Sequence, residues 1–467
     1  MNLISQYSVR IAHYNHIFAN TVAVYRCAVD FFIDVCLREW TLFANLKYQT
    51  ESTAVMERLT VTTKNRISVP YDLAKVDKRF YKMPCYLRRS AIAEAYGKVC
   101  SYKSSLANWE AAELSARDKC PSFPKAGYVY PVLYKNNMYA CTDNPYIFKV
   151  KVYIRNTWDW LSVTVRKSDV DYIRRHCASQ KQLSPTLQKR GKVWSLDFAF
   201  EEKVTLSDLP VNEQTIVTVD LGIKNACTCS VMSSDGTILG RRFLKLPREY
   251  DSLWHVAGKI KKAQRLGARN PKTLWARAKG LNDRLSVLTA QFIIDTAVLY
   301  NADVIVMEHL DLQHKKHGSQ KQRLALWRAK YVQAMVEHKA HANGMRVSHV
   351  NAWGTSRLAY DGSGKVLRGK ESERTYGNYS ICEFQNGKIY NCDLNASYNI
   401  GARYFIRELL KPLSETTRLL IEAKVPQCSK RSTCTLSTLV SLHAALLELA
   451  PKDAESGPYG GGAVRCA

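Results

Sequence analysis

Three acidic residues stand at points where the chain passes from one structural element to the next. Asp220 ends the apolar, β-branched run Ile216–Asp220, and Glu308 ends a second apolar run over 302–308. Asp393 opens a segment of helical character over 393–403. One such acid alone is typical of a turn or a cap. Three of them brought together offer the oxygen ligands that Mg²⁺ prefers, so the set indicates a divalent-cation site.

The chemistry that this site would support is hydrolysis of a phosphodiester bond. Two Mg²⁺ ions about 4 Å apart activate a water molecule and stabilise the leaving 3′-oxygen in an in-line displacement. We expect Asp220 to bridge both ions, Glu308 to bind one of them and Asp393 to bind the other. The alternative is a fold that keeps these positions around a degenerate site.

The elements around the acids predict how the three would meet. A second strand over 226–232 follows the strand that ends at Asp220, and a turn at 235–236 leads into a third strand. Two strands joined through Asp-Gly are a strong hairpin signal. From 216 to 410 the order is three strands, helices, a strand, a helix, a strand, an insertion and a helix. This is the order of an RNase H-like fold, in which the first and fourth strands are neighbours and the last helix crosses them, so the acids would converge.

The charge balance indicates a polyanionic partner. The chain has 467 residues, with 68 Lys and Arg against 41 Asp and Glu, which gives a net charge of +27. This length is enough for about two to four domains. Lys and Arg bind phosphates by releasing counterions, so we expect the partner to be nucleic acid. A basic surface without a ligand and a ribosome-like structural role are the alternatives.

The apolar segments and the cysteines predict the compartment. No apolar run reaches the length of a membrane span, and the N-terminus is too polar for a secretory signal, so we expect no membrane partner. The 14 cysteines include no C-x-x-C pair, and many lie in apolar segments, which is typical of free thiols in a reducing compartment. We expect a cytoplasmic protein, associated with the nucleoid if the host is prokaryotic.

The first half of the chain changes from helical to strand-like patterns. Apolar residues recur every three or four positions over 14–40 and 88–112, which predicts helices. The segment Pro121 to Pro124 then ends the helical pattern. The strand-like runs that follow indicate a small β-barrel-like unit, and they lie at 127–134, 146–155, 158–166 and 193–204.

Basic side chains flank the acids along the sequence. A helix that starts near 251 carries several of them, and the irregular insertion over 351–391 carries others, including Lys365, Arg368 and Lys370. They are candidates for holding a nucleic-acid strand over the acids, whereas a solvated basic face is the alternative for each. The candidate nucleic-acid-binding residues are Lys259, Lys261, Lys262, Arg265, Arg323, Arg328, Arg357 and Arg374.

Three short motifs resemble a known family. Residues 219–225, 307–310 and 393–401 resemble the three RuvC motifs of the TnpB proteins, which are transposon-encoded relatives of the miniature type V CRISPR effectors. The resemblance covers the nuclease half, roughly 210–405, and is only architectural over 1–205. It says nothing about the chain after about residue 412.

The resemblance implies an α+β multidomain chain. It would combine an RNase H-like (RuvC) nuclease domain with an N-terminal β-barrel-like wedge domain and an inserted helical recognition lobe. The implied divisions are 1–10 and 121–209 for the wedge-like domain, 11–120 for the helical lobe, 210–411 for the nuclease domain with a lid insertion over 351–391, and 412–467 for a tail that is helical and then disordered.

The resemblance also implies an enzyme, a metal-dependent DNA endonuclease guided by RNA. A guide RNA from the transposon end would direct cleavage of matching double-stranded DNA next to a short flanking motif. A miniature type V CRISPR effector is an alternative that only the neighbouring locus distinguishes. A guide-dependent repressor that does not cut conflicts with the three intact acids. A guide-free resolvase or transposase conflicts with the large N-terminal half.

The chain departs from the TnpB pattern in the segment before the last acid. Family members carry a four-cysteine zinc ribbon there, but the first cysteine pair would fall near Ala359 and Gly362, where neither residue is cysteine. The second pair would start at Cys382, but its partner position is Gln385. A closed structural zinc site needs four ligands, and Cys392 alone does not complete it. We therefore expect no structural zinc and a more mobile lid. The two Mg²⁺ ions expected at the three acids do not depend on the ribbon.

Metal analysis of the purified protein tests the expectation about zinc. We expect well under one zinc atom per chain by plasma mass spectrometry, because the ribbon positions hold too few cysteines. A family member with both cysteine pairs is the positive control. One stoichiometric zinc in this chain would contradict the expectation.

Overall fold

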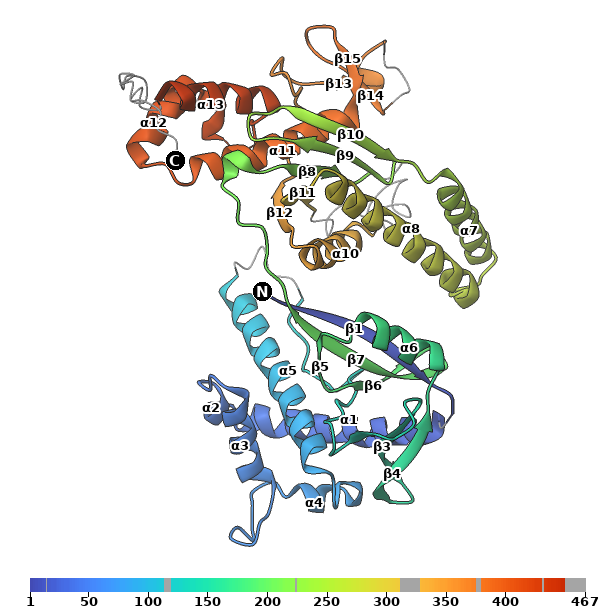
Figure 1. Cartoon of the computed structure of the whole chain (residues 1–467). Coiled ribbons are helices and arrows are strands. Elements are labelled where there is room, and N and C mark those ends of the chain that lie inside the picture. Colours follow the sequence, from blue (N-terminus) through green and yellow to red (C-terminus); the bar gives the residue numbers. More distant parts are fainter. Residues whose placement is uncertain are drawn as a thin grey trace, which may run out of the picture. The chain divides into compact units, whose positions relative to one another are not determined.

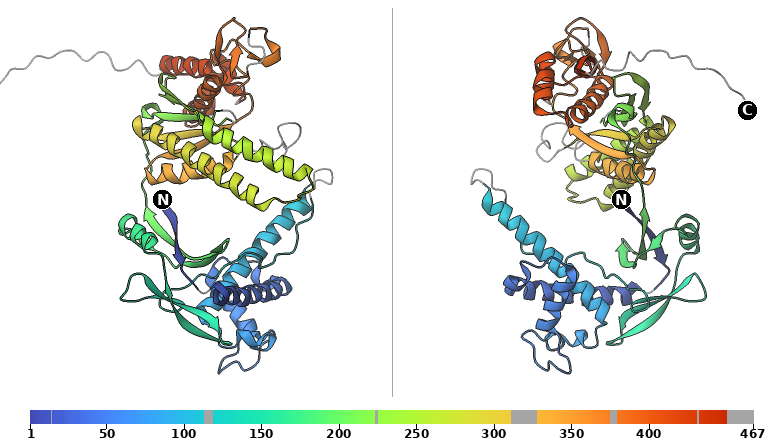
Figure 2. Two further views of the ribbon diagram at one scale, coloured as in Figure 1. Left: turned by 90° about the vertical axis from the view of Figure 1, so that its right-hand side faces the viewer. Right: turned by 60° about the vertical axis from the view of Figure 1, so that its left-hand side comes forward.

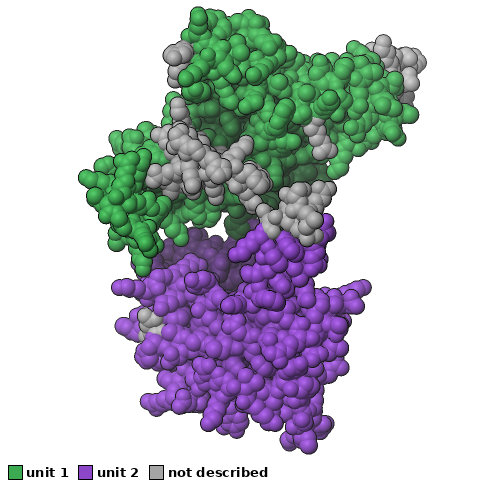
Figure 3. Space-filling model, turned by 180° about the vertical axis from the view of Figure 1, so that it is seen from behind, with its two compact units in different colours: residues 1, 204–467 green, residues 2–203 purple. Residues whose placement is uncertain are grey.

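The chain forms two compact units, one of residues 2–203 and one of residue 1 with residues 204–467 (Figure 3). Both mix helices and strands, so the prediction of a multidomain α/β chain is confirmed. No helix in the described ranges is long and apolar enough to cross a bilayer. The computed structural model describes residues 1–13, 15–112, 119–222, 225–310, 328–374, 379–430 and 432–449.

Two long helices form the core of the 2–203 unit (Figure 1). α1 (Asn15–Arg38) and α5 (Cys85–Ala111) pack against each other along apolar faces. Phe18, Phe32 and Ile92 are fully buried, and each such side chain contributes about 1.5–3 kcal/mol through the hydrophobic effect. The helical periodicity of this part of the sequence is confirmed. The shorter helices of the unit are α2 (Trp40–Phe43), α3 (Gln49–Thr60), α4 (Leu73–Val76), η1 (Lys78–Phe80) and α6 (Lys167–His176).

The strands of this unit form two open sheets. In one sheet β7 pairs antiparallel with β1, β5 and β6, and in the other β3 pairs with β2 and β4. Neither sheet closes on itself among the described residues, so the predicted barrel is not confirmed. The strands are β1 (Asn2–Ile11), β2 (Tyr139–Cys141), β3 (Ile147–Ile154), β4 (Thr157–Thr164), β5 (Lys181–Gln182), β6 (Thr186–Arg190) and β7 (Val193–Lys203).

One predicted strand is wrong. Residues 127–134 form no strand, and Val132 makes only an isolated bridge to Thr186. Pro131 lies in the middle of this run and has no N–H to donate to a ladder. The apolar character of the run reflects the complete burial of Leu133 in an irregular segment.

A five-stranded sheet organises the second unit, in the order β10-β9-β8-β11-β12. β8 pairs antiparallel with β9 and parallel with β11, and β11 pairs parallel with β12. The first and fourth strands of the unit are therefore neighbours, as the element order predicted. These strands are β8 (Ile216–Asp220), β9 (Cys227–Met232), β10 (Ile238–Leu244), β11 (Val304–His309) and β12 (Arg346–Asn351).

Helices cover both faces of this sheet. Successive strand residues point to opposite faces, so Ile216 and Val304 pack in one apolar cluster, whereas Val217 and Ile305 pack in another. The first cluster includes α11 (Cys392–Leu410) and α13 (Leu436–Leu449), and the second includes α8 (Lys272–Leu299) and α10 (Ala329–Ala342). α7 (Pro247–Arg265) lies beside α8, as Figures 1 and 2 show, and α12 (Glu415–Lys424) precedes α13.

A glycine sets how closely α11 approaches the sheet. A β-carbon at Gly401 would lie 2.6 Å from Thr218 Cγ2 and 3.0 Å from Met232 Cε, which is closer than packed atoms approach. Only glycine leaves room for the helix backbone at this crossing, because both neighbours are buried side chains of the sheet. The helix can therefore lie directly over β8 and β9.

The insertion between β12 and α11 has its own small core. Ala359, Cys382 and Phe384 are buried in it, and Tyr360 packs edge-on against Tyr398 of α11 with ring centroids 5.2 Å apart. Ala359 stands where the TnpB pattern has a cysteine, so apolar packing occupies that position here. The insertion forms a three-stranded sheet of β13 (Leu367–Arg368), β14 (Ile381–Glu383) and β15 (Ile389–Asn391).

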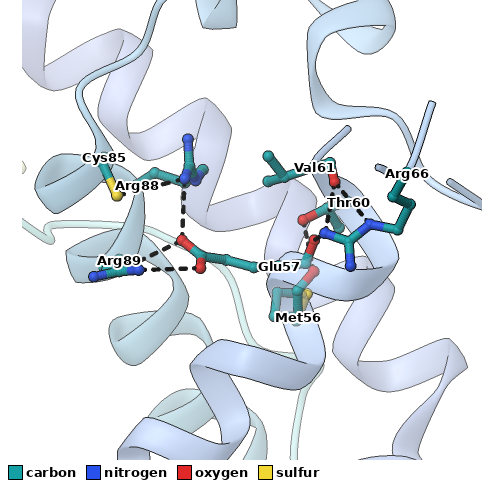
Figure 4. Close-up of polar contacts among 8 residues, drawn as sticks. All are labelled: Met56, Glu57, Thr60, Val61, Arg66, Cys85, Arg88 and Arg89. Carbon is teal, nitrogen blue, oxygen red and sulfur yellow. Dashed lines mark hydrogen bonds and ion pairs between the residues drawn. The ribbon is translucent and has the colours of Figure 1, made fainter. Parts of the chain in front are cut away.

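An ion cluster joins α3 to α5 in the first unit, and Figure 4 shows its contacts. Glu57 accepts hydrogen bonds from Arg88 Nη2 at 3.0 Å and from Arg89 Nε at 3.1 Å. The Glu57 side chain is 19% exposed. Burial raises the pKa of this carboxyl, but the two guanidinium groups outweigh burial and hold its pKa below the usual range.

Replacing Glu57 tests how much this cluster stabilises the fold. We expect Glu57→Gln to lower the free energy of unfolding by roughly 1–3 kcal/mol at neutral pH, because two arginines lose their counter-ion. Because the pKa of Glu57 is depressed in the folded state, the ion cluster stabilises the fold fully above the pKa that Glu has in the unfolded chain, about 4.3. This stabilisation is lost as the pH falls below that value.

Urea denaturation from pH 3 to pH 7 measures the effect. Glu94→Gln is the matched control, since it removes a surface i,i+4 pair with Lys98 at 3.5 Å, which contributes about 0.5 kcal/mol or less. Equal losses in both variants would contradict the assigned role of Glu57.

Candidate active site

Two of the predicted acids end neighbouring parallel strands. The pairing of β8 with β11 sets Val219 opposite Met307, and Asp220 and Glu308 come next on their strands. Strand alternation turns both acids toward the face that α11 covers, because Val219 and Met307 point to the opposite face. Asp220 and Glu308 are both half-buried.

The third acid lies in the first turn of α11. Asn391 caps this helix, and its Oδ1 accepts hydrogen bonds from the backbone N–H groups of Asp393 and Leu394, each at 3.0 Å. Asp393 also accepts a hydrogen bond from Asn225 Nδ2 at 2.6 Å. A carboxylate in this turn is favourable because the N-terminal end of a helix carries partial positive charge.

The other two acids affect the protonation of Asp220. Burial raises the pKa of Asp220 well above its usual range, and the negative charges of Glu308 and Asp393 raise it further. Burial also raises the pKa of Glu308, although the Thr355 hydroxyl and the charge of Arg403 offset part of that shift. The structure therefore brings the three predicted acids together, and the positive charge around them does not fully offset their negative charges.

The donor chemistry of the cluster suits a hard divalent cation. Its oxygens belong to carboxylates from two strand ends and one helix start, and a bound cation would relieve their repulsion. Across the described ranges, no three His, Cys, Asp or Glu side chains are already spaced as a metal site. Glu308 and Asp393 instead accept hydrogen bonds from Thr355 and Asn225.

Sequence comparisons place the chain among known proteins. The family model "Cas12f1-like, TNB domain" matches residues 330–400, which include β12, the insertion and the start of α11. A second model, the Aq_aa04 family, matches residues 5–154. The TnpB-like protein MJ0751 of Methanocaldococcus jannaschii is 28% identical over 160 residues, which is 32% of this chain and 57% of that protein. The chain is therefore similar in sequence to a TnpB-like protein and, over residues 330–400, to the Cas12f1-like TNB domain.

Solved structures show only distant similarity to this chain. The match to a Cas12f1–sgRNA–target DNA complex covers 85% of this chain and 98% of the matched protein chain, at 14% identity and a TM-score of 0.31. An AacC2c1–sgRNA–extended non-target DNA ternary complex covers 84% and 64%, at 10% identity and a TM-score of 0.38. The chain spans somewhat more than half the length of the curated relative that it matches.

Arg368 is the basic residue of the insertion that acts on the acid cluster. It lies on β13, and its positive charge offsets part of the rise in the pKa of Asp220. It also interacts with Cys392, the residue before Asp393. The insertion thus contributes a guanidinium whose positive charge acts on Asp220.

The other basic candidates are not grouped around the acids in the described contacts. Lys259, Lys261, Lys262 and Arg265 are exposed on α7, opposite the apolar face that packs on α8, and Arg357 is exposed. Arg328 pairs with Asp283 and stacks over Tyr331, and Arg374 pairs with Glu383 at 3.1 Å. Arg323 lies outside the described residues.

The sequence analysis missed Arg403, a buried cation on α11. Its guanidinium donates to the backbone oxygens of Asn351 at 2.7 Å, Trp353 at 2.8 Å, Ser432 at 3.0 Å and Cys434 at 3.3 Å. It therefore ties the end of β12 and the C-terminal segment to α11. No local signal reveals this role, because every partner lies at least 29 residues away.

The raised pKa of Asp220 predicts a pH-dependent cost to stability. A carboxyl with a raised folded pKa favours folding while it is protonated, and this contribution is lost as the pH rises through the folded value. In chelator at pH 7 we therefore expect Asp220→Asn to unfold at a higher temperature than the wild type. Below about pH 4 the two should converge, since the unfolded carboxyl is then also protonated.

Asp235→Asn is the matched control, because we expect it to shift the unfolding temperature in the opposite direction. Burial raises the pKa of Asp235, but hydrogen bonds from Ser233 and Thr237 outweigh burial and lower this pKa to about 2. The charge of Asp235 therefore stabilises the fold at any pH above the pKa that Asp has in the unfolded chain. We expect Asp235→Asn to unfold at a lower temperature at pH 7. Destabilisation by both variants would show that Asp220 is not under electrostatic strain.

Proposed function

We propose that the chain is an RNA-guided DNA endonuclease that cuts by Mg²⁺-dependent phosphodiester hydrolysis in an RNase H-like, RuvC-type site. The observation that carries this proposal is the position of Asp220 and Glu308 at the ends of neighbouring parallel strands, where the charges of Glu308 and of Asp393 on α11 both act on Asp220. The order of the five-stranded sheet, with α11 across its first and fourth strands, supports an RNase H-like interpretation.

Within this proposal the carboxylates hold the cofactor. Asp220 would bridge two Mg²⁺ ions, and Glu308 and Asp393 would each bind one of them. The ions would supply an activated water and charge stabilisation at the leaving oxygen. Thr355 and Asn225 orient Glu308 and Asp393, and Arg368 supplies positive charge for the scissile phosphate.

The partners proposed are a guide RNA and target double-stranded DNA. The net charge of +27 supports binding to long polyanions, and base pairing with a guide would read the sequence. We assign the nuclease to residues 210–411 and guide binding to the wedge-like segments 1–10 and 121–209 with the helical lobe 11–120. The insertion over 351–391 would act as the lid.

Purification with its native flanking sequence tests the proposal directly. We expect the chain, expressed with its neighbouring locus, to retain one structured RNA species that sequencing maps next to the gene. A transposon end at that position supports the TnpB interpretation, whereas a repeat array supports the miniature type V effector. Purified chain without any bound structured RNA would contradict guidance by RNA.

Loss of the bridging acid should separate cutting from guide binding. We expect Asp220→Ala to lower the rate of Mg²⁺-dependent DNA cleavage by at least about a thousandfold, because it removes several kcal/mol of charge stabilisation at the reacting phosphate. Co-purified RNA should stay at the wild-type level. Asp251→Ala, which alters an exposed carboxylate on α7, is the control and should cut normally. Undiminished cleavage by Asp220→Ala would show that the acids are misassigned.

A further inference from the structure

A cavity of about 680 Å³ lies inside the second unit. The end of β12 lines it with His349, Val350 and Asn351, and the last turns of α11 supply Arg403 and Arg407. The chain beyond α11 closes it through α12 and the segment around Cys428. None of the three acids lines it, so it is distinct from the proposed cutting site. Its volume falls in the range of small-molecule sites.

The lining carries more positive than negative charge. Arg403, Arg407, Lys411 and Arg418 face one carboxylate, Glu408. Arg407 pairs with Glu408 at 2.8 Å, and Arg418 pairs at 2.8 Å with Glu422, which does not line the cavity. The bonds of Arg403 go to neutral backbone carbonyls. Lys411 has no ion pair within the part of the chain that the structure describes. A cavity with this excess of cations suits an anion.

The cations are held in place before any ligand arrives. Arg407 donates to Ser348 Oγ at 2.7 Å and to the His349 backbone oxygen at 3.1 Å, so its guanidinium is fixed against β12. Its Nη2 also lies 2.8 Å from Glu408 Oε1, so the second N–H group of Nη1 is the one that the hydrogen bonds and the ion pair among described residues leave unused. Preorganised donors of this kind reduce the entropy lost on binding.

The rest of the lining is mostly apolar, with the polar side chains of His349, Asn351 and Ser429. Val350, Ile406, Leu410 and Leu413 contribute hydrocarbon surface, and the Asn351 side chain contributes an amide. Asn351 Oδ1 accepts a hydrogen bond from the Trp353 N–H at 2.9 Å, which leaves the amide N–H₂ for another acceptor. A ligand that fits both parts has a phosphate and a flat, mostly apolar ring that carries hydrogen-bond acceptors.

We propose that this cavity binds a nucleoside phosphate, with the phosphate near Lys411 and Arg418 and the base among Ile406, Leu410 and Asn351. The nucleotide would be either free or the terminal nucleotide of a strand, since both present the same chemistry. This inference goes beyond the proposed endonuclease activity and does not depend on it.

Equilibrium dialysis of the full chain in chelator tests the proposal with two probes. One probe is adenosine 5′-monophosphate, and the other is a single-stranded tetranucleotide with a 5′-phosphate. We expect one saturable site for at least one probe, and inorganic phosphate should compete for it. Binding of the monophosphate indicates a free nucleotide, whereas binding of the tetranucleotide alone indicates a strand end.

Charge reversal at the cavity rim supplies the decisive comparison. Lys411 and Arg418 are exposed, so Lys411→Glu and Arg418→Glu should fold, and each should weaken binding by about tenfold or more through loss of a charge-assisted hydrogen bond. Lys424→Glu is the control on the same segment, because Lys424 pairs with Glu448 and does not line the cavity. No saturable binding of either probe, or equal weakening by the control, would overturn the proposal. Co-purified RNA, measured in parallel, reports separately on the endonuclease proposal.

Discussion

The close contact between α11 and the five-stranded sheet determines where the last acid lies. Gly401 lets the helix backbone rest on Thr218 and Met232, at a distance that a β-carbon would prevent. With the helix on that face, its first turn brings Asp393 to the ends of β8 and β11. Three carboxylates from distant parts of the sequence are thus gathered by one helix crossing, and their repulsion is the cost of that arrangement.

The surroundings of the acids balance this repulsion only in part. Thr355 and Asn225 bind single carboxylates, and the positive charges of Arg368 and Arg403 act from the insertion and from α11. Functional sites commonly keep such strain, because the ligand that relieves it is absent until the site is occupied. Aromatic packing holds the insertion on α11.

The acid site was predictable because its signals are local. The ends of two apolar runs identified Asp220 and Glu308, the start of a helical segment identified Asp393, and the order of elements over 216–410 predicted that they converge. The open sheets of the first unit were not predictable as such, because closure depends on pairing between distant strands, and Pro131 interrupts one run that resembles a strand. Arg403 escaped prediction because all its partners are carbonyls remote in sequence.

The central claim is that these three carboxylates form one cation site. Titration of metal-free protein with Mn²⁺, followed by electron paramagnetic resonance, measures this most directly. The account predicts saturable binding that Asp220→Asn, Glu308→Gln and Asp393→Asn each weaken strongly, whereas Asp251→Asn leaves it unchanged. Saturable binding that survives any one of the three substitutions at full affinity would contradict it.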